Sequence, residues 1–180
     1  MAQLFSYWHC EPGRGINCMR PILLSLVLMS SFVYGQAQAA PDKIRTDVRT
    51  VQTAVNDAVG GSLPGWGVLQ AAKAAYLDGY GVVVTMEIAF DSPANPFTGN
   101  KSPEEIRASA AQKRTEIQEK LINVLKQKTA SLDSIAPTES VAIILNVLNT
   151  NPAYVPNMPS QIIFSVKKQD AAHPSIKEYR

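Results

Sequence analysis

The clearest pattern in the chain is an alternation of side-chain types between residues 82 and 90. One side of this stretch is apolar throughout: Val82, Val84, Met86, Ile88 and Phe90. The other side is mixed: Val83, Thr85, Glu87 and Ala89. A period of two with many β-branched residues is typical of a strand with one buried face. Asp78-Gly79 lies just before it, and this dipeptide favours the two-residue type I′ turn of a hairpin.

The hairpin requires residues 67–77 to form the partner strand. A helix is the alternative, because residues 69–75 are mostly good helix formers and Gly79 would suit a helix C-terminus. We favour the strand because Gly65 and Gly67 punctuate its start and the strand at 82–90 needs an antiparallel neighbour. Trp66, just before it, is expected to cover the core rather than to bind a ligand.

Apolar residues spaced three or four apart predict two helices. The first spans residues 42–59, ends at Gly60-Gly61, and carries a stripe of five residues: Ile44, Val48, Val51, Val55 and Val59. The second begins at Ser102-Pro103 and runs for about 27 residues, or roughly 40 Å. Ser102 is expected to cap it, with Glu105 completing a capping box.

Two further strands follow. Residues 141–148 are almost all apolar, which indicates a strand that is central or covered on both sides. Residues 161–167 alternate again, and Lys167-Lys168 would suit an exposed edge or end of the sheet.

The resulting order, α-β-β-α-β-β, predicts an α+β fold. We expect a four-stranded, mainly antiparallel sheet with both helices on one face. The other face would carry an apolar patch suited to a partner or to self-association, made of Val83, Ala89, Ile144, Leu148 and Ile163.

The first 39 residues have the layout of a secretory signal peptide. Met19-Arg20 supplies positive charge, residues 21–34 are apolar, and Ala37-Gln38-Ala39 offers a cleavage site. The apolar run is shorter than the ~20 residues that span a bilayer, although an uncleaved signal anchor is the alternative, and would be the only membrane attachment. Residues 1–18 are expected to be an extension upstream of a true start at Met19. One domain at 40–170 and a flexible tail at 171–180 would follow.

Composition narrows the chemistry of the exported part. Cleavage after Ala39 leaves 141 residues with no cysteine, one histidine (His173) and a formal charge of +1. Disulfides, thiol catalysis and metal sites built from several histidines are therefore excluded. A nearly neutral chain has no electrostatic reason to bind nucleic acid. Asp91 and Asn95 do not have the spacing of a calcium loop, so neither a metal nor a cofactor is expected.

Carboxylates remain as candidate catalytic groups. Asp78, Glu87 and Asp91 lie in or beside the hairpin, and Tyr76 and Tyr80 flank its turn. Two carboxylates at a suitable separation can cleave glycosidic bonds. The plainer interpretation, which we favour, is that Asp78 forms the turn and Glu87 is solvated. We therefore expect a non-catalytic binding or structural domain of the bacterial cell envelope, periplasmic or secreted, acting through a protein partner or self-association; a small carboxylate-dependent hydrolase is the alternative.

The segment from Tyr76 to Glu87 resembles the YLxGYGVVF-type segment of a group of uncharacterised exported bacterial proteins. Its turn contributes Asp78, Gly79, Tyr80 and Gly81 to the match. Residues 132–141 and 160–166 are similar to the same group in outline. The resemblance implies export and a bacterial source, and it carries no known activity from which functional residues could be transferred.

Overall fold

The computed structural model describes residues 41–63, 67–90 and 101–180. The predicted signal peptide, Trp66 and Asp91 lie outside the described residues. Residues Ala39–Arg180 form one compact unit, which extends ten residues beyond the predicted end of the domain at residue 170.

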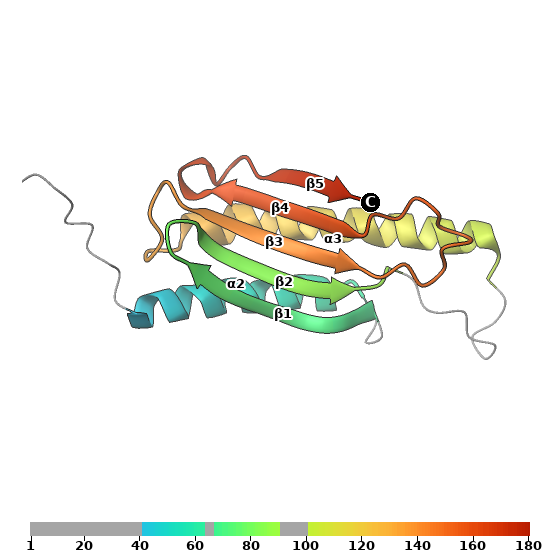
Figure 1. Cartoon of the computed structure of the whole chain (residues 1–180), viewed down its shortest axis with the longest axis horizontal. Helices are drawn as coiled ribbons and strands as arrows, with labels where there is room; N and C mark the ends of the chain where they lie inside the picture. Colours follow the sequence, from blue (N-terminus) through green and yellow to red (C-terminus); the bar gives the residue numbers. More distant parts are fainter. Residues whose placement is uncertain (1–40, 64–66, 91–100) are drawn as a thin grey trace, which may run out of the picture. The chain divides into compact units, whose positions relative to one another are not determined.

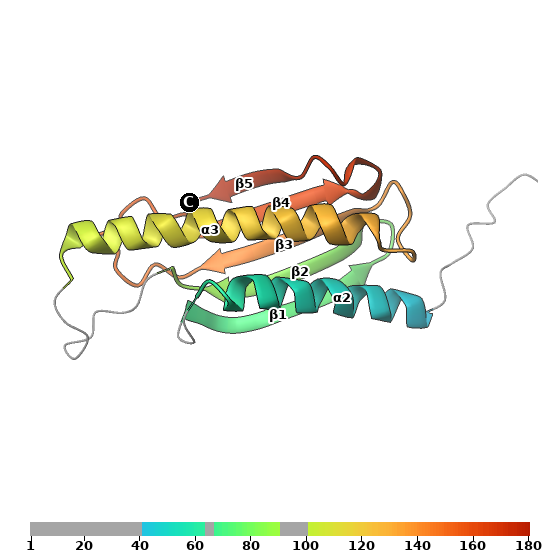
Figure 2. The ribbon, with the colours of Figure 1, turned by 180° about the vertical axis from the view of Figure 1, so that it is seen from behind.

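The described residues of this unit form two helices and five strands, and a short 3-10 turn, η2 (Lys168–Asp170), separates the last two strands. In chain order the elements are α2 (Pro41–Gly60), β1 (Val68–Leu77), β2 (Gly81–Ile88), α3 (Pro103–Ala130), β3 (Ser140–Val147), β4 (Gln161–Lys167) and β5 (Ser175–Tyr179). The strands form one sheet in the order β1-β2-β3-β4-β5. Both helices pack on the same face of it, as Figure 1 shows from one side and Figure 2 from the other.

The predicted α+β class is confirmed, but the prediction of four mainly antiparallel strands is wrong. β2 and β3 pair in parallel, whereas the other three pairs are antiparallel. The parallel pair arises because α3 carries the chain back along the sheet before β3 begins, as parallel neighbours require. The two hairpins therefore join through β2 and β3, and the sheet is mixed.

The segment predicted to be a flexible tail, residues 171–180, supplies the fifth strand. β5 pairs antiparallel with β4 from Ser175↔Ser165 to Tyr179↔Gln161. Its Glu178 also binds α3, where Arg114 donates to one carboxylate oxygen and Gln118 Nε2 donates to the other at 2.8 Å. Because β5 pairs with β4, Lys167 does not lie on an edge strand. It is the exposed last residue of β4, which agrees with the predicted alternative of an end of the sheet. Backbone pairing holds β5 although all five of its residues are exposed.

The predicted hairpin is present, with β1 as a strand rather than a helix, but its turn is one residue longer than predicted. Leu77 pairs with Gly81, so three residues form the loop. The Tyr80 N–H donates to the Leu77 carbonyl at 3.0 Å. Gly79 has the positive φ that the sequence suggested, +74°, and Gly81 has φ +115°. A second glycine with positive φ lets the chain enter β2 after the longer loop.

The core lies between the sheet and the two helices. The apolar side of β2 is fully buried there, as predicted from its alternation. β3, which the sequence predicted to be central or covered on both sides, is the middle strand and is covered by helices on one face. α2 contributes Val51, Val55 and Val59, and α3 contributes Ile106, Ala110, Ile117, Leu121 and Leu125.

α3 begins with the capping box. The Ser102 hydroxyl accepts from the Glu105 N–H at 3.2 Å, and Glu105 Oε2 accepts from the Ser102 N–H at 2.7 Å. This start is fixed by residues within one turn of each other, which is why it can be seen in the sequence.

Candidate functional site

The three carboxylates considered for catalysis do not form a pair in the described residues. Asp78 lies in the turn before β2, and Glu87 lies near the far end of the same strand. At about 3.3 Å per residue, Gly81 and Glu87 are roughly 20 Å apart, and Asp78 lies beyond Gly81. Acid–base pairs in glycosidases are about 5–10 Å apart. Asp91 lies outside the described residues.

Tyr76 binds a buried carboxylate that the sequence did not suggest. Its hydroxyl donates to Glu139 Oε1 at 2.7 Å, and Glu139 Oε2 accepts from the Ala136 N–H at 2.8 Å. Glu139 is only 8% exposed. The hydrogen bond to Glu139, together with burial, raises the pKa of Tyr76 to about 12. The pair ties β1 to the residue before β3, so Tyr76 has a structural contact rather than a free reactive hydroxyl.

Tyr80 and Gly81, at the end of the same segment, lie against the backbone of Ser140. A Cβ added to Gly81 would overlap the Ser140 carbonyl oxygen. The Ser140 N–H donates to the Tyr80 carbonyl at 2.7 Å in the same place. Tyr80 itself is 43% exposed. This close approach joins the end of the hairpin to β3.

The open face of the sheet, the side opposite the helices, is not covered by any helix or strand of the described residues (Figure 1). Strand register arranges its side chains in rows across the strands. The middle row contains two lysines at its ends and two isoleucines inside: Lys73, Thr85, Ile144, Ile163 and Lys177. One flanking row is small or apolar: Ala75, Val83, Ala142, Ser165 and Ser175. The other is polar: Gln70, Glu87, Asn146, Gln161 and Tyr179.

The apolar patch predicted for this face is present only in part. Val83, Ile144 and Ile163 lie on it and are half-buried. Leu148 is 56% exposed just beyond β3. Ala89 is buried, because the chain at Gly67 lies against it and accepts its N–H at 2.9 Å.

Charge on the open face is mainly positive. Lys73 and Lys177 end the middle row, Lys167 pairs with Ser140 at one end of the sheet, and Glu87 is the one acid among the paired positions of this face. In the described residues none of these four side chains has a hydrogen bond or ion pair. The sequence could not show that Lys73 and Lys177 lie in the same row. Their alignment depends on the pairing register of the three strands between them, β2, β3 and β4.

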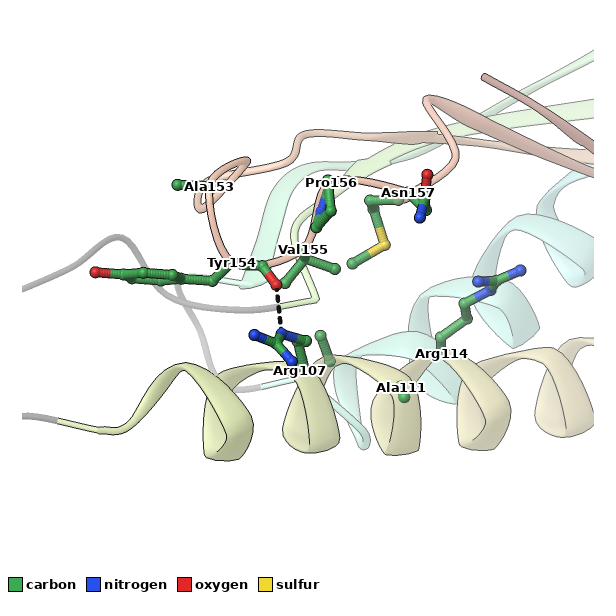
Figure 3. A pocket seen from close by; sticks show the side chains of 10 residues that line it. Arg107, Ala111, Arg114, Ala153, Tyr154, Val155, Pro156 and Asn157 are labelled. Carbon is green, nitrogen blue, oxygen red and sulfur yellow. Dashed lines mark hydrogen bonds between the residues drawn. The ribbon is translucent and has the colours of Figure 1, made fainter.

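A separate pocket of about 390 Å³ lies between α3 and the loop that joins β3 to β4 (Figure 3). Arg107 and Arg114 stand at its ends, and the loop faces the helix with residues 153–158. Arg107 Nε donates to the Tyr154 carbonyl at 2.9 Å, which fixes the loop to the helix. The sequence identified α3 but offered no signal for this contact between residues 47 positions apart.

Within the described ranges, no group of three or more histidine, cysteine, aspartate and glutamate residues is placed to hold a metal ion. A search of the same residues for a helix long and apolar enough to cross a membrane found none. Comparison of the chain with protein-family models, with curated proteins and with solved structures gives no match.

Proposed function

We propose that the chain is an exported, non-catalytic binding domain, periplasmic or secreted, that holds a protein partner on the open face of its sheet. One observation carries the proposal: an apolar centre lies between two unpaired lysines in a single row across the five strands. Interfaces combine an apolar centre with a polar rim in this way. The complementary surface would be an apolar ridge flanked by carboxylates.

The charges favour a different protein over a second copy of the chain. A two-fold axis parallel to the strands, centred on β3, would place Lys73 of one copy over Lys177 of the other. An axis along the middle row would place each lysine over its own counterpart. Both arrangements bring like charges together, which costs free energy in an interface.

Site-specific cross-linking tests the proposed surface. A photoreactive residue at Thr85, in the middle row, should give an adduct with a partner in cells, whereas one at Thr50 on α2 should not. The double variant Lys73→Glu/Lys177→Glu should abolish the Thr85 adduct. Lys43→Glu/Lys126→Glu, the same charge change on exposed helical residues, should retain it.

The mass of the adduct decides between partners. An adduct of twice the chain mass would identify self-association and contradict the charge argument. No adduct at Thr85, or one that persists in the Lys73→Glu/Lys177→Glu variant, would overturn the proposed binding face.

Export is tested separately. N-terminal sequencing of the extracytoplasmic protein should find a start within about two residues of Ala40, as the signal layout predicts. Intact Met1 or Met19 on a soluble cytoplasmic protein would contradict export without bearing on the binding face.

A further inference from the structure

The pocket beside α3 has the construction of a small-molecule site and shares no residue with the open face. Two small side chains, Ala110 and Ala111, form its floor on the helix. The β3–β4 loop lies opposite the helix (Figure 3) and contributes Pro156, Asn157 and Met158 to the lining. Because the helix presents alanines where longer side chains would fill the gap, about 390 Å³ remains empty. Ligand pockets in proteins begin at about 300 Å³.

The two arginines at the ends of the pocket differ in what they bind. They are seven positions apart on α3, about two turns or roughly 10 Å. Arg114 forms an ion pair with Glu178, and each side chain is 32% exposed. The positive charge of Arg114 is therefore already neutralised by the Glu178 carboxylate.

A hydrogen bond holds the Arg107 side chain in place, but its positive charge is only weakly neutralised by a carboxylate. Its Nε bond to the Tyr154 carbonyl uses one donor and leaves the two terminal nitrogens. The nearest carboxylate oxygen, Glu104 Oε1, is 3.7 Å from Nη2, and both side chains are more than half exposed. Exposed pairs of this kind contribute little, so Arg107 can accept an anionic ligand at small cost.

We propose that this pocket binds a small carboxylate carried on an apolar chain, with the carboxylate on Arg107 and the chain between the alanines and Met158. A guanidinium binds a carboxylate through two parallel hydrogen bonds. A single negative charge fits better than a phosphate dianion, because Glu104 and Glu178 lie at the two ends and would repel the second charge. Of the remaining lining residues, Ala153, Val155 and Pro156 are apolar, whereas Tyr154 and Asn157 carry polar groups.

Methyl NMR of the purified protein tests the site, with octanoate as the probe. Octanoate should shift the Ala110, Val155 and Met158 methyl signals saturably, and 1-octanol, which lacks the charge, should bind at least tenfold more weakly. Arg107→Gln should weaken octanoate binding about tenfold or more, since a charge-assisted pair is lost. Arg45→Gln is the matched control, because Arg45 has a similar exposed i,i+3 pair with Asp42 on α2.

A second variant keeps Arg107 intact. Ala111→Leu should fill the pocket and abolish the shifts, whereas Ala108→Leu, at an exposed alanine of the same helix outside the lining, should not. The carboxylate could belong to a peptide C-terminus or to a free small acid. A tripeptide ending in leucine, tested as the free acid and as the amide, distinguishes these two sources. Tighter binding of the tripeptide acid than of octanoate assigns a peptide C-terminus, and the reverse assigns a free acid.

Three results would overturn the proposal. They are an absence of saturable shifts up to about 10 mM probe, equal binding of octanoate and 1-octanol, and equal loss of binding in Ala111→Leu and Ala108→Leu.

Discussion

At the scale of single residues, two glycines on either side of Tyr80 are required for different reasons. Gly79 has φ +74°, and nothing lies within 4 Å of an added Cβ. Gly81 has φ +115°, and an added Cβ would meet the Ser140 backbone. The first position is limited by backbone conformation alone, whereas the second is limited by conformation and by contact with β3.

Substitutions should separate the two cases. Gly79→Asn should be mild and Gly79→Val should cost about 1–2 kcal/mol, because β-branched residues tolerate positive φ badly. Gly81→Ala should cost on the order of 3 kcal/mol or more, since a backbone atom must move as well. Urea denaturation measures the free energies of unfolding. A Gly81→Ala protein as stable as the Gly79→Asn protein would contradict the close contact with Ser140.

Tyr76 should make the free energy of unfolding depend on pH in the alkaline range. The unfolded side chain titrates near pH 10, whereas contact with Glu139 raises the pKa of Tyr76 to about 12 in the folded protein. The unfolded state therefore loses this proton first. The contribution of Tyr76 is complete below about pH 10 and is lost as the pH rises from 10 to 12.

Tyr76→Phe should remove this part of the alkaline slope and cost about 1–2 kcal/mol at neutral pH, since Glu139 loses a donor. Denaturation between pH 8 and 12 compares the two proteins, with Tyr80→Phe as the control for an exposed hydroxyl. Parallel slopes for wild type and Tyr76→Phe would show that the Tyr76–Glu139 bond does not persist in solution.

At the scale of elements, α2 and β1 are joined at an irregularity in the strand. The register of β1 against β2 shifts between Gln70 and Lys73. Such a bulge leaves one amide without a partner in the ladder. The Ala72 N–H is satisfied instead by Asn56 Oδ1 on α2, at 2.9 Å. Because Ala72 is buried, water cannot readily replace this hydrogen bond. The Asn56 side chain of α2 therefore supplies the acceptor that the Ala72 amide lacks in the sheet.

Asn56→Leu should cost about 1–3 kcal/mol, because the buried Ala72 amide would be left unpaired. Asn56→Asp keeps an acceptor oxygen and should cost less. Gln52→Leu, one turn earlier on α2, is the control for adding an apolar side chain to this helix. Thermal denaturation gives the order of stabilities, and equal values for Asn56→Leu and Gln52→Leu would contradict the role of Asn56.

At the scale of the whole molecule, the last strand, β5, covers the edge of β4 and forms the last strand of the sheet. β5 pairs with β4, and Glu178 also reaches Arg114 and Gln118 on α3. Unpaired strand edges promote association between chains. Without β5, residues 161–167 would become such an edge, and this strand contains the buried Ile162 and Phe164.

Deletion of residues 171–180 should therefore lower the melting temperature and cause concentration-dependent association. Glu178→Gln, which removes the ion pair but keeps the strand, should show a smaller loss of stability and no association. Calorimetry and sedimentation measure the two effects. A truncated protein as stable and as monomeric as the full chain would support the flexible tail that the sequence suggested.

Local features of this protein could be predicted from its sequence. The alternation at 82–90, the valine stripe of the first helix, the capping box at Ser102 and the positive φ of Gly79 each depend on residues a few positions apart. These features depend on residues close in the sequence and not on distant contacts, so they can be recognised from the sequence alone. The same holds for the signal-like layout of residues 1–39, which remains a prediction.

Only the tertiary structure decided which strands are neighbours and which distant side chains meet. Alternation shows that a strand has two faces but not which strand lies beside it, so the parallel β2–β3 pair could not be predicted. A polar tail carries no apolar pattern, and β5 forms because β4 offers backbone partners and α3 offers Arg114. The Tyr76–Glu139 and Arg107–Tyr154 contacts join residues 63 and 47 positions apart. Their energies depend on positions that the packed helices and sheet create, and no short stretch of sequence contains them.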